Sequence, residues 1–248
     1  MDYSYQLYSA RNEASLDDTL KTLKSLGYSQ VEGWGGQFGD PAALAQSLKN
    51  AGLTMPTAHM GYAQLEDTDA VLKIVDAVGI QTVYCPAPPS EEFRNGGGDW
   101  QGFAEGLARI AAAFKAAGKG FGYHNHHWEF GKVNGKTPIE IILDASPDLQ
   151  WEMDLAWVVK ANEDPIAWMD RLGSRITAIH VKDIAPAGEA LDEDGWADVG
   201  QGTLDWNKLL ADAKAKTRAT YFVAEHDKPS DAIRFARRSM EALKGYGA

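Results

Sequence analysis

The chain has little cysteine and no long apolar run. Cys85 is the single cysteine among 248 residues, which excludes an intramolecular disulfide and a zinc site built from thiolates. This suits a reducing compartment, with the cytoplasm as the default location. No run of about 18 apolar residues occurs, and the N-terminus lacks a cationic segment followed by an apolar one, so we expect no membrane partner.

Positive charge is scarce as well. Lysine and arginine number 24 against 35 aspartates and glutamates, which gives a formal net charge of −11. Such a chain repels a phosphate backbone and lacks the basic surface of a nucleic-acid-binding protein. Hydrophobic residues make up 44% of the chain, enough for a sizeable core. We therefore expect one globular domain over residues 1–248, with a small molecule rather than a nucleic acid as its partner.

Short apolar segments alternate with amphipathic segments eight times along the chain. The strand-like segments cover residues 5–8, 30–33, 55–59, 82–85, 120–124, 149–154, 176–180 and 221–225. The helix-like segments cover residues 15–26, 41–51, 67–78, 103–117, 137–145, 165–172, 205–213 and 230–243. Eight β/α units in about 250 residues predict a single (β/α)8 TIM barrel, although an open doubly wound sheet shares the alternation.

Polar residues of metal-ligand type close six of the predicted strands. They are Glu32, His59, His124, Asp154, His180 and Glu225. The C-terminal ends of barrel strands converge on one site, so we expect these side chains to lie together. Buried carboxylates and imidazoles need neutralisation, which a single cation would provide. Because sulfur is absent from the set, the residues favour one divalent ion, Mn²⁺ first, with Mg²⁺, Co²⁺ or Zn²⁺ as alternatives.

Each of these residues also has a plainer interpretation. A lone histidine such as His59 can be structural, and Glu32 can pair with a neighbouring lysine or arginine or support a ligand from behind. Tryptophans near the strand ends, Trp157 among them, suit the apolar face of a sugar ring but equally suit core packing. A single metal site explains all six polar strand ends together, so we favour a functional site over six separate structural roles.

Other motifs carry weaker signals. Gly200-Gln201-Gly202 suggests a phosphate loop but lacks the flanking pattern, so a tight turn before the next helix is favoured. Gly118, Gly120 and Gly122 precede a strand, whereas the glycines of a dinucleotide fingerprint follow one. No His-Glu-x-x-His or Gly-x-Ser-x-Gly segment occurs, so zincin proteases and α/β-hydrolases lack their motifs.

Several motifs together carry a family resemblance. They are Tyr123-His124-Asn125-His126-His127-Trp128-Glu129-Phe130, Glu152-Met153-Asp154 with Trp157-Val158, His180-Val181-Lys182-Asp183, Gly200-Gln201-Gly202 and Glu225-His226-Asp227. In order and spacing, this set resembles the sugar phosphate isomerase/epimerase family of xylose isomerase-like TIM barrels, in the branch marked by a Tyr-His-Asn-His-x-x-Glu-Phe run. The resemblance spans nearly the whole chain, from the second strand to the eighth.

The resemblance implies one divalent cation held by a carboxylate of the fifth unit, an aspartate after strand six, a histidine after strand seven and a glutamate on strand eight. In this chain those residues are Glu129, Asp154, His180 and Glu225. Epimerases of this kind often place the first carboxylate on strand five itself, where this chain has His124. Either His124 or Glu129 is therefore the expected ligand, with the other near the substrate.

The expected reaction is isomerisation or epimerisation of a free, oxidised or phosphorylated sugar or cyclitol. It requires removal of a proton next to a carbonyl, and a bound metal stabilises the enediolate. Glu225 and either His124 or Glu129 are expected to flank the substrate as acid and base. Lys182 is expected to polarise a substrate oxygen. The expected substrate-binding residues are Glu32, His59, His126 and Trp157.

Three other functions stay open. The same enediolate can expel a β-leaving group, which would make the protein a dehydratase of a keto-cyclitol or a lyase of a 3-keto-glycoside. An endonuclease IV-like nuclease shares the barrel, but the net charge of −11 argues against a DNA substrate. A non-catalytic sugar-binding module needs the aromatic residues but not four residues of metal-ligand type.

A homo-oligomer is also possible, because the chain end near Tyr246 and exposed helix faces could form a contact between two copies.

Overall fold

Eight parallel strands close into a barrel in the computed structural model, which describes residues 2–246. In order around the barrel they are β1 (Tyr3–Gln6), β10 (Tyr221–Ala224), β7 (Ile176–Val181), β6 (Leu149–Asp154), β5 (Gly120–His124), β4 (Thr82–Cys85), β3 (Thr54–His59) and β2 (Gln30–Gly33). The predicted (β/α)8 barrel is confirmed. The open-sheet alternative is wrong, because β1 pairs with both β2 and β10.

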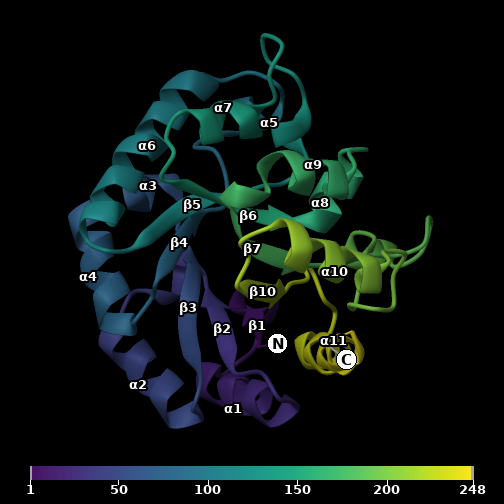
Figure 1. Ribbon diagram of the computed structural model, residues 1–248. Coiled ribbons are helices and arrows are strands. Elements are labelled where there is room, and N and C mark those ends of the chain that lie inside the picture. The colour runs from purple at the N-terminus through teal and green to yellow at the C-terminus, as the bar shows by residue number, and fades with distance from the viewer. Residues whose placement is uncertain (1, 247–248) are drawn as a thin grey trace.

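Helices follow the strands and cover the outside of the barrel (Figure 1). They are α1 (Leu16–Leu26), α2 (Pro41–Ala51), α3 (Tyr62–Leu65), α4 (Thr68–Val78), α5 (Glu91–Arg94), α6 (Trp100–Ala116), α7 (Pro138–Asp144), α8 (Leu155–Lys160), α9 (Pro165–Leu172), α10 (Trp206–Lys216) and α11 (Ala232–Gly245). The Ser15 side chain accepts a hydrogen bond from the Asp18 backbone N–H and so starts α1. The same helix ends at Gly27, whose φ of 109° is a left-handed conformation that glycine adopts without strain.

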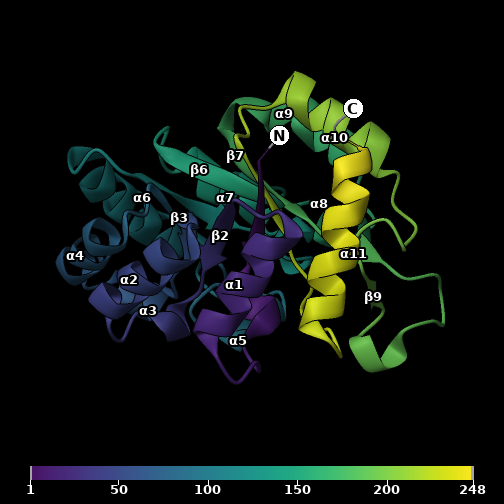
Figure 2. The ribbon, with the colours of Figure 1, turned by 90° about the horizontal axis from the view of Figure 1, so that it is seen from below.

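The barrel closes between its first and last units. Tyr3 of β1 pairs in register with Phe222 of β10, and Ser4 pairs with Gln30 of β2. Outside this seam α1 packs against α11, and Figure 2 shows the two helices as neighbours. The two ends of the chain therefore complete one wall of the barrel.

The burial pattern separates an apolar core from a polar mouth. Between strands and helices the buried side chains are apolar, as Leu20, Leu107 and Ile142 illustrate. At the C-terminal ends of the strands, side chains are also buried but polar, including those of Glu32 and His180. A polar cluster is therefore buried at the C-terminal ends of the strands, where TIM barrels carry their active sites.

The first strand differs from its prediction. The alternation of apolar residues predicted a strand over residues 5–8, whereas β1 covers Tyr3–Gln6 and Leu7–Ala10 forms a 3-10 helix, η1. The reason is a local hydrogen bond: the Gln6 side chain accepts from the Tyr8 backbone N–H at 3.0 Å and turns the chain out of the sheet.

The long connections contain structure that the pattern did not predict. Residues 86–100 include the short helix α5, and residues 183–197 form a two-stranded hairpin of β8 (Asp183–Ile184) and β9 (Trp196–Ala197). The helix α8, directly after β6, was also not predicted. The remaining 3-10 helices are η2 (Gly35–Gln37), η3 (Trp128–Phe130), η4 (Gly173–Arg175) and η5 (Leu191–Glu193). Within residues 2–246, no helix has the length and apolar character needed to cross a membrane.

Candidate metal centre and active site

The structure brings the polar strand ends together at the barrel mouth. The residues Glu32, His59, His124, Asp154, His180 and Glu225 are all buried there. Glu152 lies among them, although the sequence analysis gave it no role. Successive strand residues point to opposite faces, so Glu152 shares a face with Asp154 and lies one step deeper along β6.

Three imidazoles occupy the centre of the cluster. The ring centroid of His124 lies 4.7 Å from that of His59 and 4.5 Å from that of His180. The rings of His59 and His180 are stacked at 5.2 Å. Burial, reinforced by the nearby His180, lowers the pKa of His124 to about 3, so this ring is neutral and keeps a lone pair for a metal ion.

Two carboxylates lie on the deep side of the imidazoles. Glu32 Oε1 is 2.8 Å from His180 Nε2 and 3.2 Å from His59 Nε2. Glu152 Oε2 is 2.5 Å from His59 Nε2, 3.1 Å from His124 Nδ1 and 3.2 Å from His180 Nε2. Glu32 is also held by the Gln6 side-chain amide at 2.8 Å. Its partners are thus histidines and an amide, and not the lysine or arginine of the plainer interpretation.

Two further carboxylates lie on the outer side, toward the cavity. Glu225 Oε2 is 3.0 Å from His180 Nδ1, the ring nitrogen opposite the one that faces Glu32. Asp154 caps α8, because its Oδ1 accepts a hydrogen bond from the Trp157 backbone N–H at 3.0 Å. The other oxygen, Asp154 Oδ2, has no hydrogen-bond partner among the described residues.

Lys182 supplies the positive charge of this outer layer. Its buried ammonium lies 2.6 Å from Asp227, 3.2 Å from Glu225 and 3.6 Å from Asp154. Burial alone would lower the pKa of Lys182, but the carboxylates, Asp227 first, raise it above its ordinary value. Burial still raises the pKa of Asp154 to about 6 despite Lys182. The ammonium therefore does not fully compensate the buried carboxylates.

The cluster has the donor geometry of a metal site. Two overlapping sets of four residues each place their ligand atoms within 4.8 Å of one another. The deep set is His59, His124, Glu152 and His180, and the outer set is His124, Asp154, His180 and Glu225. Three buried carboxylate oxygens without a hydrogen-bond partner, on Glu32, Glu152 and Asp154, add to the need for a cation. The residues present therefore fit a divalent ion with nitrogen and oxygen ligands.

Glu129 lies outside both sets. It sits on η3, where its carboxylate accepts hydrogen bonds from the Tyr123 hydroxyl at 2.6 Å and from the His126 backbone N–H at 2.8 Å. Burial raises the pKa of Glu129 to about 7. Of the two residues that the sequence left as fifth-unit ligands, His124 has the ligand geometry, while Glu129 holds the loop that carries His126.

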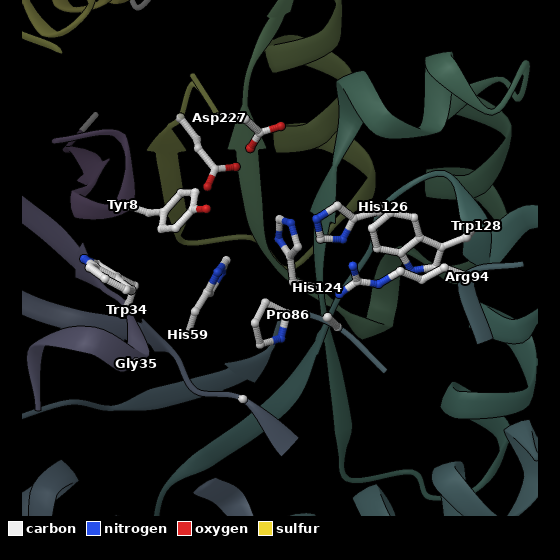
Figure 3. Close-up of a pocket in the computed structure, with 13 residues that line it drawn as sticks. Tyr8, Trp34, Gly35, His59, Pro86, Arg94, His124, His126, Trp128 and Asp227 are labelled. Atoms are coloured by element: carbon white, nitrogen blue, oxygen red, sulfur yellow. The ribbon is translucent and has the colours of Figure 1, made fainter. Parts of the chain in front are cut away.

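A cavity of about 380 Å³ opens above the cluster (Figure 3). Its polar and aromatic lining residues are Tyr8, Trp34, His59, Arg94, His124, His126, Trp128, Glu225 and Asp227. The volume lies in the range of small-molecule sites. Trp157, predicted to bind substrate, packs against His126 with ring centroids 5.3 Å apart but does not belong to this lining. Tyr8 lies in η1 and Arg94 ends α5, two short helices that the sequence pattern did not predict.

The Gly200-Gln201-Gly202 segment forms a structural turn. Asp183 Oδ2 accepts hydrogen bonds from the backbone N–H groups of Gly200 at 2.9 Å and Gly202 at 3.2 Å. A Cβ atom at Gly202 would lie 2.2 Å from Asp183 Oδ1, so only glycine fits. The N–H groups that a phosphate would need are already taken, which agrees with the tight turn favoured from the sequence.

The sequence of this chain is similar to a family of known proteins. Residues 20–246 match the family described as xylose isomerase-like TIM barrel. The chain belongs to this family. Comparison with curated proteins gives no significant match.

Solved structures of xylose isomerase-like and related barrels share the fold at low sequence identity. A sugar phosphate isomerase/epimerase from Parabacteroides distasonis ATCC 8503 is 20% identical, with 98% of this chain and 97% of that chain covered and a TM-score of 0.81. The probable 3-DHS dehydratase AsbF from Bacillus anthracis is 14% identical, with 98% and 99% covered and a TM-score of 0.76. The IOLI protein, solved with a bound zinc atom, is 12% identical, with 99% and 98% covered and a TM-score of 0.78. At these identities the likenesses show that the fold is shared, and they do not identify the reaction.

Proposed function

We propose that this protein is a divalent-metal-dependent isomerase or epimerase of a sugar or cyclitol. The observation that carries the proposal is the layer of three imidazoles between two pairs of buried carboxylates, at the base of a cavity with aromatic walls. Trp34 offers a flat apolar face to a sugar ring, and His59 and His126 offer polar groups to its hydroxyls. The scarcity of lysine and arginine fits a small-molecule substrate.

The outer set of His124, Asp154, His180 and Glu225 would hold the metal ion, with Mn²⁺ as our first choice. When bound, the ion supplies Lewis acidity that makes a carbon next to a sugar carbonyl more acidic. Asp154 is prepared for ligation because the α8 backbone occupies Oδ1, while Oδ2 has no hydrogen bond and lies 3.6 Å from the Lys182 ammonium. Glu32 at His180 Nε2 orients the ring, and Nδ1, which faces Glu225 of the same set, is the nitrogen that would ligate the ion. Second contacts of this kind fix the orientation of a ligand ring.

Glu225 is the proposed base. It lines the cavity and keeps a low pKa: burial alone would raise it, but Lys182 at 3.2 Å and His180 at 3.0 Å lower it well below the usual range. The carboxylate is therefore ionised and able to accept a proton from a substrate carbon. Return of that proton to the neighbouring carbon, with the hydroxyl proton moving to the former carbonyl oxygen, gives isomerisation. Delivery of a proton to the same carbon from its opposite face gives epimerisation. Glu129 does not line the cavity, so we assign it to positioning the His126 loop rather than to proton transfer.

β-Elimination remains the second candidate because it begins with the same proton removal by Glu225. The outcome depends on whether a leaving group sits next to the carbanion. Asp227 lines the cavity beside Glu225, and the Lys182 ammonium, 2.6 Å from Asp227, is buried behind it and outside the cavity lining. The same experiment can identify either reaction, because elimination changes the mass of the product and isomerisation does not.

The test measures metal content and turnover in parallel. Protein purified without added metal is analysed for bound ions, reloaded with Mn²⁺, and incubated with a panel of ketoses and 3-keto-glycosides. We expect one ion per chain and turnover that Glu225→Gln abolishes. Because Glu225 is also a proposed metal ligand, the variant is assayed at Mn²⁺ concentrations that fill its site. Glu241→Gln on the exposed surface of α11 removes the same charge and is the matched control. Absence of metal binding after reloading, or full turnover by Glu225→Gln, would refute the proposal.

A further inference from the structure

Arg94 brings a positive charge into a cavity whose other charged lining groups are acidic. The remaining ionised lining residues are Glu225 and Asp227, and both contact Lys182. Within residues 2–246, the Arg94 guanidinium has neither a carboxylate at ion-pair distance nor a hydrogen-bond acceptor. Among the residues that line the cavity, Arg94 alone carries a positive charge, and its side chain is exposed to solvent. Its five N–H donors are available to a ligand.

The Arg94 guanidinium makes a cation–π contact with the cavity wall. The Arg94 guanidinium carbon lies 4.9 Å from the Trp128 ring centroid, and the His126 ring is stacked on Trp128 at 4.2 Å. His126 in turn lies 5.2 Å from His124, the proposed metal ligand. A series of flat groups therefore extends from the proposed metal ligand His124 to Arg94, and the Trp128 ring places the guanidinium along the cavity wall.

The two ends of the cavity differ in charge. Figure 3 shows Arg94 and Trp128 on one side of His124, with Tyr8, Trp34 and Asp227 away from them on the other. The lining residues near Arg94 are apolar or aromatic, including Pro86 and Trp128, so no built-in carboxylate competes for the guanidinium. An anion entering a protein of net charge −11 needs such a local cation.

We propose that the substrate carries an oxyanionic group, a carboxylate or a phosphate, which Arg94 binds at the end of the cavity remote from Asp227. This inference rests on the proposed function, because it places the sugar carbonyl at the metal centre and the anionic group at Arg94. The planar guanidinium matches either oxyanion with two parallel hydrogen bonds. The substrate class thereby narrows to sugar acids and sugar phosphates.

The experiment compares three ligands that differ only at one carbon: fructose, fructuronate and fructose 6-phosphate. Their dissociation constants are measured by calorimetry on the Mn²⁺-loaded protein, on Arg94→Gln, and on Arg237→Gln. Arg237 is exposed on α11 and outside the cavity, so its variant matches the loss of charge. We expect one of the two anions to bind the wild type about tenfold more tightly than fructose. Arg94→Gln should lose that preference and Arg237→Gln should keep it.

The preferred anion identifies the group, a carboxylate for fructuronate and a phosphate for fructose 6-phosphate. Equal binding of all three ligands by the wild type, or a preference that survives in Arg94→Gln, would overturn the inference and leave the proposed function standing. Failure of all three ligands to bind the metal-loaded protein would overturn the inference together with the proposed ketose site. Arg94→Lys adds a geometric check, because it keeps the charge but loses the paired hydrogen bonds and should retain only part of the preference.

Discussion

Replacing Glu152 with glutamine tests whether the deep carboxylates support the metal centre. Glu152 Oε2 lies within 3.2 Å of a ring nitrogen on each of three histidines, so the variant removes one negative charge shared by all of them. Breaking a buried charge pair by removing one partner costs about 3–5 kcal/mol. Loss of a residue that hydrogen-bonds metal ligands and orients them lowers metal affinity about 10- to 100-fold.

Both quantities can be measured on the same preparations. Urea unfolding in the presence of a chelator gives the stability of the metal-free protein, and competition with a chromophoric chelator gives the Mn²⁺ affinity. Glu163→Gln is the control, because Glu163 is exposed and accepts a hydrogen bond from Trp168 far from the cluster. We expect Glu152→Gln to be less stable and to bind Mn²⁺ more weakly, with Glu163→Gln close to wild type. Unchanged Mn²⁺ affinity in Glu152→Gln would refute the reasoning that the deep layer supports the ligands.

Three further predictions follow from individual contacts. Burial raises the pKa of Glu129 to about 7 from 4.5, so its proton is held more tightly in the folded state. The contribution of Glu129 to stability should be full below pH 4.5 and decrease by about 3 kcal/mol as pH rises through 7. In urea unfolding at pH 5 and pH 8, the difference between the two pH values should be smaller for Glu129→Gln than for the wild type by about this amount. Gly202→Ala should lower the melting temperature, because the new Cβ would displace Asp183 from four backbone N–H groups; an unchanged melting temperature would contradict the role given to the turn. Removing the metal with a chelator should lower the free energy of unfolding of the wild type by about 3 kcal/mol, compared with protein in free Mn²⁺ at 100 times its dissociation constant. In thermal unfolding, Asp154→Asn should show a smaller difference between the two conditions.

The sequence predicted the barrel and most of its strands because short parallel strands and capped helices leave local signals. Four predicted strands, at residues 30–33, 82–85, 120–124 and 149–154, have the observed bounds. The first strand was misplaced by two residues because Tyr3 to Tyr8 is equally strand-like throughout. Its true register is set by pairing with β10 and β2, which are distant contacts that no local pattern contains.

The candidate site was predictable where it coincides with the strand ends. His124, Asp154, His180 and Glu225 come together because the barrel makes its strand ends converge. Glu152 was missed although its signal was present, since a residue two positions before Asp154 on a strand must share its face. Arg94 could not have been found, because the short helix α5 that places it was not predicted and only the folded cavity shows what it lines.

Solvent deuterium exchange tests the central claim, metal-assisted proton removal by Glu225, most directly. The Mn²⁺-loaded wild type is incubated with the ketose panel in D₂O, and the sugars are analysed by mass spectrometry and NMR. The account predicts deuterium at a carbon next to the carbonyl of at least one sugar, dependent on metal and absent in Glu225→Gln. No exchange with any sugar in the metal-loaded wild type, or exchange that persists in Glu225→Gln, would contradict it.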